Sequence, residues 1–269
     1  MKIGIYKDFV YMYALYRKII NSVSLSQTMK LLKQQIQEIA SSISNPLVLI
    51  YKSDEELVPE DNDYIFQFLE GNKKEETSLI ISGGGGHFEP SIELAAYLRQ
   101  KFRKHLYTYI PNQASSALAY PILISNHASC CNSTPLSQFD LTFDISGKTY
   151  RAKNEITNPD SIIKDTAKHS WGISSDIIRN IISRNDSLFG KKRVLDSDIL
   201  AIMDVCMRDG EHTKPIRLKK LQKLGFKIDQ SNEDMCNKLN EIYKRTMDIL
   251  NQSNARFVIG DEERVISIN

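Results

Sequence analysis

Three short apolar runs, separated by helical segments, constrain the fold of this chain more than any other feature of its sequence. The runs lie at 46–51, 78–82 and 106–110, and residues 128–131 could form a fourth. They are continuously apolar rather than alternating, as expected of strands that are buried on both faces. Helical patterns at 61–69 and 89–102 separate them. This order predicts an α/β fold with a largely parallel sheet.

Further helical patterns flank the predicted core. Apolar residues recur at near-helical spacing over 9–19 and 29–40, which predicts two amphipathic helices or one long helix broken around 22–26. Helices are also expected over 160–182 and 196–208, and a hairpin with a Gly260-Asp261 turn over 257–268. We therefore divide the chain into a helical extension (1–44), a central domain (45–228) and a C-terminal helix and hairpin cap (229–269).

Composition excludes several classes of protein. The 269 residues, 41% of them hydrophobic and 25% charged, suffice for a buried core. The longest nearly apolar run, Ala117 to Ile124, is too short to cross a bilayer, and the N-terminus lacks the apolar segment of a secretory signal. A net charge of +2 does not force binding to nucleic acid or membranes. We expect a cytoplasmic protein whose four cysteines are free thiols without metal-binding spacing.

Two candidate chemical features directly follow predicted strands. Gly83 to Gly86 follow the second strand, and their unobstructed N–H groups could bind a phosphate or an oxyanion, although a tight turn is the plainer interpretation. Ser115 and Ser116 follow the third strand, between Ala114 and Ala117, at a turn that could be a nucleophile elbow or a helix N-cap. Because parallel strands end at the same edge of a sheet, the two features should be neighbours. Together they suit acyl transfer, in which a serine attacks a carbonyl and backbone N–H groups stabilise the oxyanion.

Motifs in three stretches follow one another in a specific order. They are Leu-Ile-Ile-Ser-Gly-Gly-Gly-Gly at 79–86, Ile-Pro-Asn-Gln-Ala-Ser-Ser-Ala at 110–117 continuing to Leu-Ser-Gln-Phe-Asp at 136–140, and Gly-Glu-His-Thr-Lys-Pro-Ile at 210–216. This pattern, over residues 46–226, resembles the serine dehydrogenase proteinase family, relatives of the Clp protease peptidase subunit and of signal peptide peptidase A. That family shows a Pro-Gly-Gly loop, an Ala-Met-Ser-Gly-Gly turn with a Leu-Gly-Pro-x-Asp-Pro loop, and Thr-His-Asp-x-Pro-Ile.

The resemblance implies a crotonase-like fold and serine-type peptide hydrolysis without a metal or organic cofactor. Carried over by position, Ser116 is the nucleophile, and the oxyanion donors are the N–H groups of Gly85 or Gly86 and of Ala117. Relatives use either a lysine or a histidine as general base, so Lys164, Lys168 and His212 are all candidates. His127 is expected to be structural. Relatives tend to form rings or stacks, which implies a homo-oligomer and allows an ATPase or another protein partner.

The chain also departs from the family pattern at four positions. Ala117 and Ser137 replace glycines, Gly84 replaces the loop proline, and Thr213 replaces the acid beside the histidine. These departures leave open a catalytically inactive scaffold or regulatory member of the same fold. A crotonase-type enzyme acting on an acyl thioester is a second alternative, because it would use the same oxyanion hole.

A basic stretch completes the sequence features. Residues 214–227 contain six basic residues and no acid. The stretch could contact nucleic acid or the acidic face of a protein partner, although a solvated helix face is the simpler interpretation. Phe226 is its only aromatic residue, so we expect no stacking platform for bases.

Overall fold

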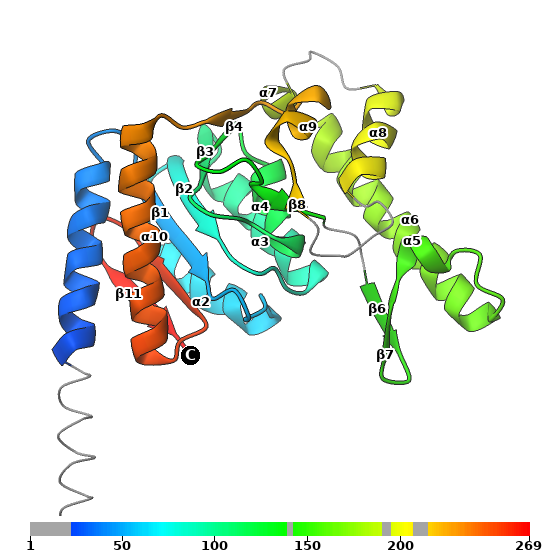
Figure 1. Cartoon of the computed structure of the whole chain (residues 1–269), viewed down its shortest axis with the longest axis horizontal. Coiled ribbons are helices and arrows are strands. Elements are labelled where there is room, and N and C mark those ends of the chain that lie inside the picture. The colour runs from blue at the N-terminus through cyan, green and yellow to red at the C-terminus, as the bar shows by residue number, and fades with distance from the viewer. Residues whose placement is uncertain (1–22, 139–141, 190–194, 207–214) are drawn as a thin grey trace, which may run out of the picture.

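The structure is a computed structural model that describes residues 23–138, 142–189, 195–206 and 215–269. Its centre is a seven-stranded sheet with the strand order β11-β10-β1-β2-β3-β4-β9 (Figure 1). Five neighbouring strands are parallel: β1 (Pro46–Tyr51), β2 (Glu76–Ser82), β3 (His105–Ile110), β4 (His127–Cys130) and β9 (Ile228–Gln230). The hairpin β10 (Phe257–Gly260) and β11 (Val265–Ile268) adds two antiparallel strands beside β1. The predicted α/β class with a largely parallel sheet is confirmed.

Helices cover both faces of the sheet and explain the continuous apolar runs. On one face, α2 (Pro59–Glu70), α3 (Phe88–Lys101) and α4 (Ala119–Leu123) pack in a core that includes Leu47 and Leu49 of β1. On the other face, the helix at 23–39 and α10 (Glu233–Ser253) pack against Val48 and Ile50. Because successive side chains of a strand point to opposite faces, a strand between two cores must be apolar at every position.

A helical arm extends from this body (Figure 1). It comprises the hairpin of β6 (Thr142–Ile145) and β7 (Lys148–Arg151), then α5 (Ala152–Glu155) and the first half of α6 (Ser161–Ser183). The chain then returns to the body through the second half of α6, α7 (Asp186–Phe189) and α8 (Asp196–Cys206). The carboxylate of Asp160 caps α6 by accepting hydrogen bonds from the N–H groups of Ile162 and Ile163. The C-terminal half of α6 joins the core through Ile178 and Ile182, whereas its N-terminal half projects away from the sheet.

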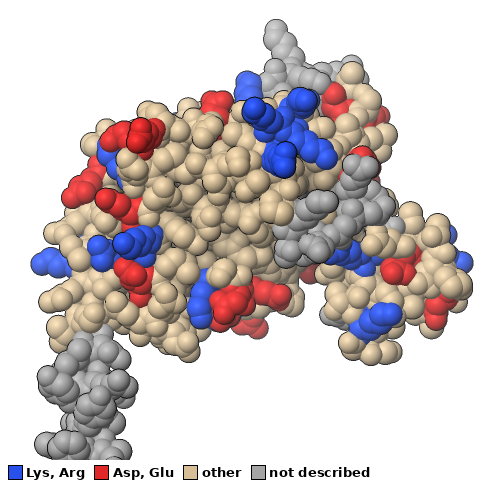
Figure 2. Space-filling view, in the orientation of Figure 1, with Lys and Arg blue, Asp and Glu red and all other residues tan. Residues whose placement is uncertain are grey.

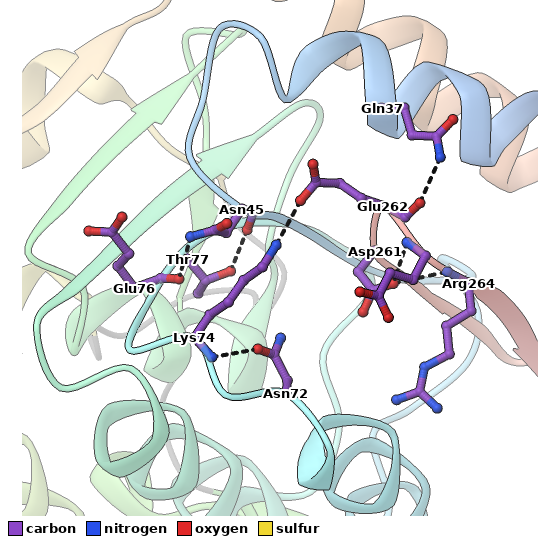
Figure 3. Close-up of polar contacts among 10 residues, drawn as sticks. Gln37, Asn45, Asn72, Lys74, Glu76, Thr77, Asp261, Glu262 and Arg264 are labelled. Carbon is purple, nitrogen blue, oxygen red and sulfur yellow. Dashed lines mark hydrogen bonds and ion pairs between the residues drawn. The ribbon is translucent and has the colours of Figure 1, made fainter.

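The C-terminal hairpin is held in the sheet by its turn (Figure 3). The Asp261 carboxylate accepts hydrogen bonds from the N–H groups of Glu263 and Arg264. The Glu262 carboxylate pairs with Lys74 Nζ at 2.8 Å, and its carbonyl accepts from Gln37 Nε2 at 2.8 Å. These contacts tie the turn to the segment before β2 and to the helix at 23–39. The predicted hairpin at 257–268 is confirmed, and it is part of the central sheet.

Most of the other sequence-based expectations for secondary structure are confirmed where the structure describes them. Helices occupy the segments predicted at 61–69, 89–102 and 160–182 and the described part, 196–206, of the segment predicted at 196–208. The N-terminal extension is helical without interruption over 23–39, so the break expected around 22–26 does not occur within 23–26. The predicted helix at 9–19 lies outside the described residues. The domain boundaries proposed at 44 and 228 stay predictions. No helix among the described residues is long and apolar enough to cross a membrane.

Candidate active site

The glycine run and the serine turn lie side by side at one edge of the sheet. The Gly83 N–H donates to the carbonyl of Gln113 at 2.9 Å, and the Ser115 N–H donates to the carbonyl of Gly83 at 3.1 Å. A parallel bridge also pairs Gly83 with Ala114. The two loops therefore form one backbone unit at the carboxyl ends of β2 and β3, which is where α/β proteins bind their ligands.

A short second ladder continues from this unit. Ala114 bridges to Leu136, and its N–H donates to the carbonyl of Pro135 at 2.9 Å. Leu136 belongs to β5 (Leu136–Ser137), which pairs antiparallel with β8 (Pro215–Ile216). The described parts of the three stretches that carried the family resemblance, of which the third contributes only Pro215 and Ile216, thus meet in one row of backbone pairs.

Ser116 has a strained backbone conformation. Its φ is 48°, in the left-handed region, and it begins the 3₁₀ turn η1 (Ser116–Leu118), whereas Ser115 is extended with φ at −96°. A non-glycine residue in this region costs about 1–2 kcal/mol, and such strain gathers at functional sites. Ser116 is also largely buried, with 9% of its surface exposed. A strained serine at a strand-to-helix turn is the geometry of a nucleophile elbow.

Two further serines hold this turn in place, and sequence reasoning did not find either role. Ser137, which is fully buried, accepts a hydrogen bond from the Ser116 N–H at 2.9 Å and donates to the carbonyl of Gln138 at 3.2 Å. Ser91, near the start of α3, donates to the carbonyl of Ala117. Twenty-one positions separate Ser116 from Ser137 and 26 separate Ala117 from Ser91, so no local pattern could indicate the contacts.

The N–H groups of Gly85 and Gly86 lie in the glycine loop, which packs against Ser116 at Gly85. Gly85 and Gly86 have φ values of 121° and 145°, which disfavour any other residue. A Cβ on Gly85 would lie 2.6 Å from Ser116 Cβ, and one on Gly86 would lie 2.2 Å from Leu57 N. Within the described part of the chain neither N–H has a hydrogen-bond acceptor. The Ala117 N–H lies in the first turn of η1, where N–H groups lack an intrahelical acceptor. Gly85 thus packs against Ser116 and Ala117 follows it in the chain, while the role of the Gly85, Gly86 and Ala117 N–H groups as oxyanion donors stays a prediction.

A buried carboxylate anchors the segment that supports the glycine loop. Leu57 donates to the carbonyl of Gly85 at 2.9 Å and accepts from the His87 N–H at 2.8 Å. The next residue, Val58, donates its N–H to Asp61 Oδ2 at 3.0 Å. Asp61 is fully buried and also contacts Arg256 Nη2 at 3.0 Å. Burial raises the pKa of Asp61, and this effect exceeds the opposing effects of the Val58 N–H and the Arg256 charge.

The raised pKa of Asp61 predicts a pH-dependent stability. Above the ordinary aspartate pKa of about 3.9, the folded state holds this proton more tightly than the unfolded state. The contribution of Asp61 to the unfolding free energy is therefore fully present below its unfolded pKa, and it is lost as the pH rises through the higher pKa of the folded state. Asp61→Asn cannot ionise, so its unfolding free energy should increase relative to wild type between pH 4 and 7. Urea unfolding at several pH values measures this difference, and a flat or falling difference would contradict the assignment.

The structure describes two of the three candidate bases and brings neither of them into contact with Ser116. Lys164 is half-buried and Lys168 is exposed, and both lie on the projecting half of α6 (Figure 1). Their side chains make no hydrogen bond or ion pair with any described residue. His212 lies outside the described residues. His127 lies on β4, with Nε2 3.1 Å from Asp229 Oδ2, a contact that fits a structural residue. The identity of the base stays a prediction.

The cysteines are free thiols, as expected. Burial raises the pKa of Cys130 to about 12 and that of Cys206 to about 12, so both thiols are protonated at neutral pH and are poor nucleophiles. Among the residues that the structure describes, no group of three His, Cys, Asp or Glu side chains could hold a metal ion. Ser116 and its surrounding backbone are thus the most developed chemical site in the described chain.

Comparisons with known proteins add only distant similarity. No family model and no curated protein matches the sequence. The structure is similar to solved structures of the 1510-N membrane-bound stomatin-specific protease. One is a serine-to-alanine mutant (TM-score 0.44, 13% identity, 76% of this chain and 86% of that chain covered). Another is a lysine-to-alanine mutant in complex with a substrate peptide (TM-score 0.45, 13% identity, 84% of this chain and 89% of that chain covered).

Proposed function

We propose that this protein is a serine-type peptide hydrolase that acts through an acyl-enzyme on Ser116. The observation that carries the proposal is the left-handed conformation of Ser116 directly beside the glycine loop. Packing alone does not explain a buried serine in this turn, since glycine would adopt the same φ without strain. The resemblance to the serine dehydrogenase proteinase family supports the same nucleophile.

In the proposed reaction, Ser116 Oγ attacks the peptide carbonyl and transfers its proton to the general base. The carbonyl oxygen becomes an oxyanion, which accepts hydrogen bonds from the N–H of Gly85 or Gly86 and that of Ala117. The protonated base gives its proton to the amine as the tetrahedral intermediate collapses and the C–N bond breaks. The base then takes a proton from water, which attacks the acyl-enzyme, and returns it to Ser116 Oγ as the acid leaves. Lys164, Lys168 and His212 stay the candidates for the base, whether supplied by the same chain or, for the two lysines on the projecting arm, by another copy in a homo-oligomer.

Covalent labelling tests the nucleophile directly. Incubation with a fluorophosphonate should add one phosphonyl group to the wild-type protein, as measured by intact mass. The adduct should be absent from Ser116→Ala and present on Ser115→Ala, which is the matched control in the same turn. An adduct that persists on Ser116→Ala would place the reactive group elsewhere.

The same experiment separates the proposed enzyme from its alternatives. A scaffold that has lost its base should give no adduct on any variant, even at high probe concentration. A thioester enzyme should depend on an acyl-CoA and be little affected by Ser116→Ala. If wild type is labelled, the labelling rates of Lys164→Ala, Lys168→Ala and His212→Ala then identify the base as the variant with the slowest reaction.

A further inference from the structure

A concentration of positive charge lies on the described surface over α9 (Leu218–Lys223), the helix that follows β8. Figure 2 shows lysine and arginine side chains gathered over this helix. The contributing residues are all exposed: Arg217, Lys219, Lys220, Lys223 and Lys227. We call these five residues the α9 basic surface.

The cations of this surface have no anionic partner within the described part of the chain. None of its five residues takes part in an ion pair or a side-chain hydrogen bond there. Asp229 is the nearest acid that follows in the sequence, and its carboxylate is turned to His127 Nε2 at 3.1 Å. Lys223 lies four positions after Lys219 and three after Lys220, so these like charges are neighbours on the helix and repel one another. An anionic partner would remove this repulsion.

The cations are also held on a fixed support. Leu218 and Leu221 on the inner side of α9 are buried in the main core. The Leu218 N–H donates to the carbonyl of Ser133 at 2.7 Å, and the Lys227 N–H donates to the carbonyl of Leu188 at 2.6 Å. Gln222, within α9, donates from its side-chain Nε2 to the carbonyl of Ile228 in β9 at 2.9 Å. The helix cannot rotate to bury its charges, so it presents them permanently to solvent or to a partner.

The distribution of charge favours a short acidic polypeptide over a nucleic acid. The whole chain has a net charge of +2, and residues 214–227 carry six basic residues and no acid, so the rest of the chain has a net charge of −4. The six residues of α9 extend about 9 Å. Duplex DNA carries a phosphate charge about every 1.7 Å along its whole length, so it would extend beyond α9 to the rest of the protein, which is negatively charged. Phe226 is buried and offers no ring to a base. An extended peptide needs only about three or four residues to cover α9.

We propose that the α9 basic surface binds an acidic segment of a polypeptide, rich in glutamate or aspartate. The proposal concerns binding and does not depend on the chemistry of Ser116. Charge complementarity of this kind gives specificity and a fast association rate, and it weakens as salt screens the charges.

The test uses the full chain and fluorescence anisotropy of labelled deca-glutamate. Wild type should bind it, and binding should weaken with added salt. The variant Lys219→Gln/Lys220→Gln/Lys223→Gln should bind roughly tenfold more weakly. The matched control is Lys30→Gln/Lys73→Gln/Lys244→Gln, which removes the same charge from exposed positions elsewhere and should change binding less than about twofold.

Three results would overturn the proposal. One is the absence of deca-glutamate binding, and another is equal weakening by the two triple variants. The third is tighter binding of a labelled DNA or RNA duplex through the same three lysines, which would assign the surface to nucleic acid. Because the readout is binding, a failure here is distinguishable from a failure of Ser116 to be labelled.

Discussion

Replacing Ser116 with alanine should reduce ester and peptide hydrolysis by about 10³-fold or more, because the acyl-enzyme can no longer form. p-Nitrophenyl acetate is a suitable first substrate, since it requires only a nucleophile and an oxyanion site. Wild type should release a burst of nitrophenolate equal to the enzyme concentration, followed by slower turnover. Ser116→Ala should lose both the burst and the turnover, and Ser115→Ala should retain them.

The unfolding free energies of two variants at Ser116 give a control that does not depend on activity. Ser116→Gly and Ser116→Ala both lack the hydroxyl, but only glycine adopts a φ of 48° without strain. The glycine variant should therefore be more stable than the alanine variant by about 1 kcal/mol in urea unfolding, and both should be inactive. Full activity in either variant would refute the proposed nucleophile, and equal stability would refute the strained turn.

Gly85→Ala should disrupt the contact between the glycine loop and Ser116. The new Cβ would lie 2.6 Å from Ser116 Cβ and 3.0 Å from the Ser115 carbonyl oxygen, at a φ of 121° that alanine avoids. Overpacking and backbone strain together should lower the unfolding free energy by about 3 kcal/mol. Relief of the clash should displace either Ser116 or the N–H groups beside it, so labelling by a fluorophosphonate should fall as well.

Gly71→Ala is the matched control for this substitution. Gly71 ends α2 with a φ of −75°, and a Cβ there would meet no atom within 4 Å. Its unfolding free energy should change by less than about 1 kcal/mol, and its labelling should match wild type. If Gly85→Ala behaves like Gly71→Ala, the glycine loop is not packed against Ser116 and the proposed oxyanion site is wrong.

Much of the site could be anticipated from the sequence because strand order determines which loops share a sheet edge. Gly83 to Gly86 and Ser115 to Ser116 each follow a buried strand directly, and the structure joins the two loops by backbone hydrogen bonds. The supporting contacts could not be anticipated. Ser137, Ser91 and the Asp61 carboxylate reach the site from distant positions, and a buried serine or aspartate has no periodicity that reveals its partner.

The sequence alone determined the α/β class, the positions of most helices and strands, and the pairing of a glycine loop with a serine turn. Local apolar patterns suffice for this, because burial on one or two faces dictates the spacing of apolar residues. Only the tertiary structure decided that the C-terminal hairpin pairs with β1, that Ser116 rather than Ser115 is strained, and that the α9 cations lack partners among the described residues. Each of these depends on contacts between residues far apart in the chain, and no local pattern encodes such contacts.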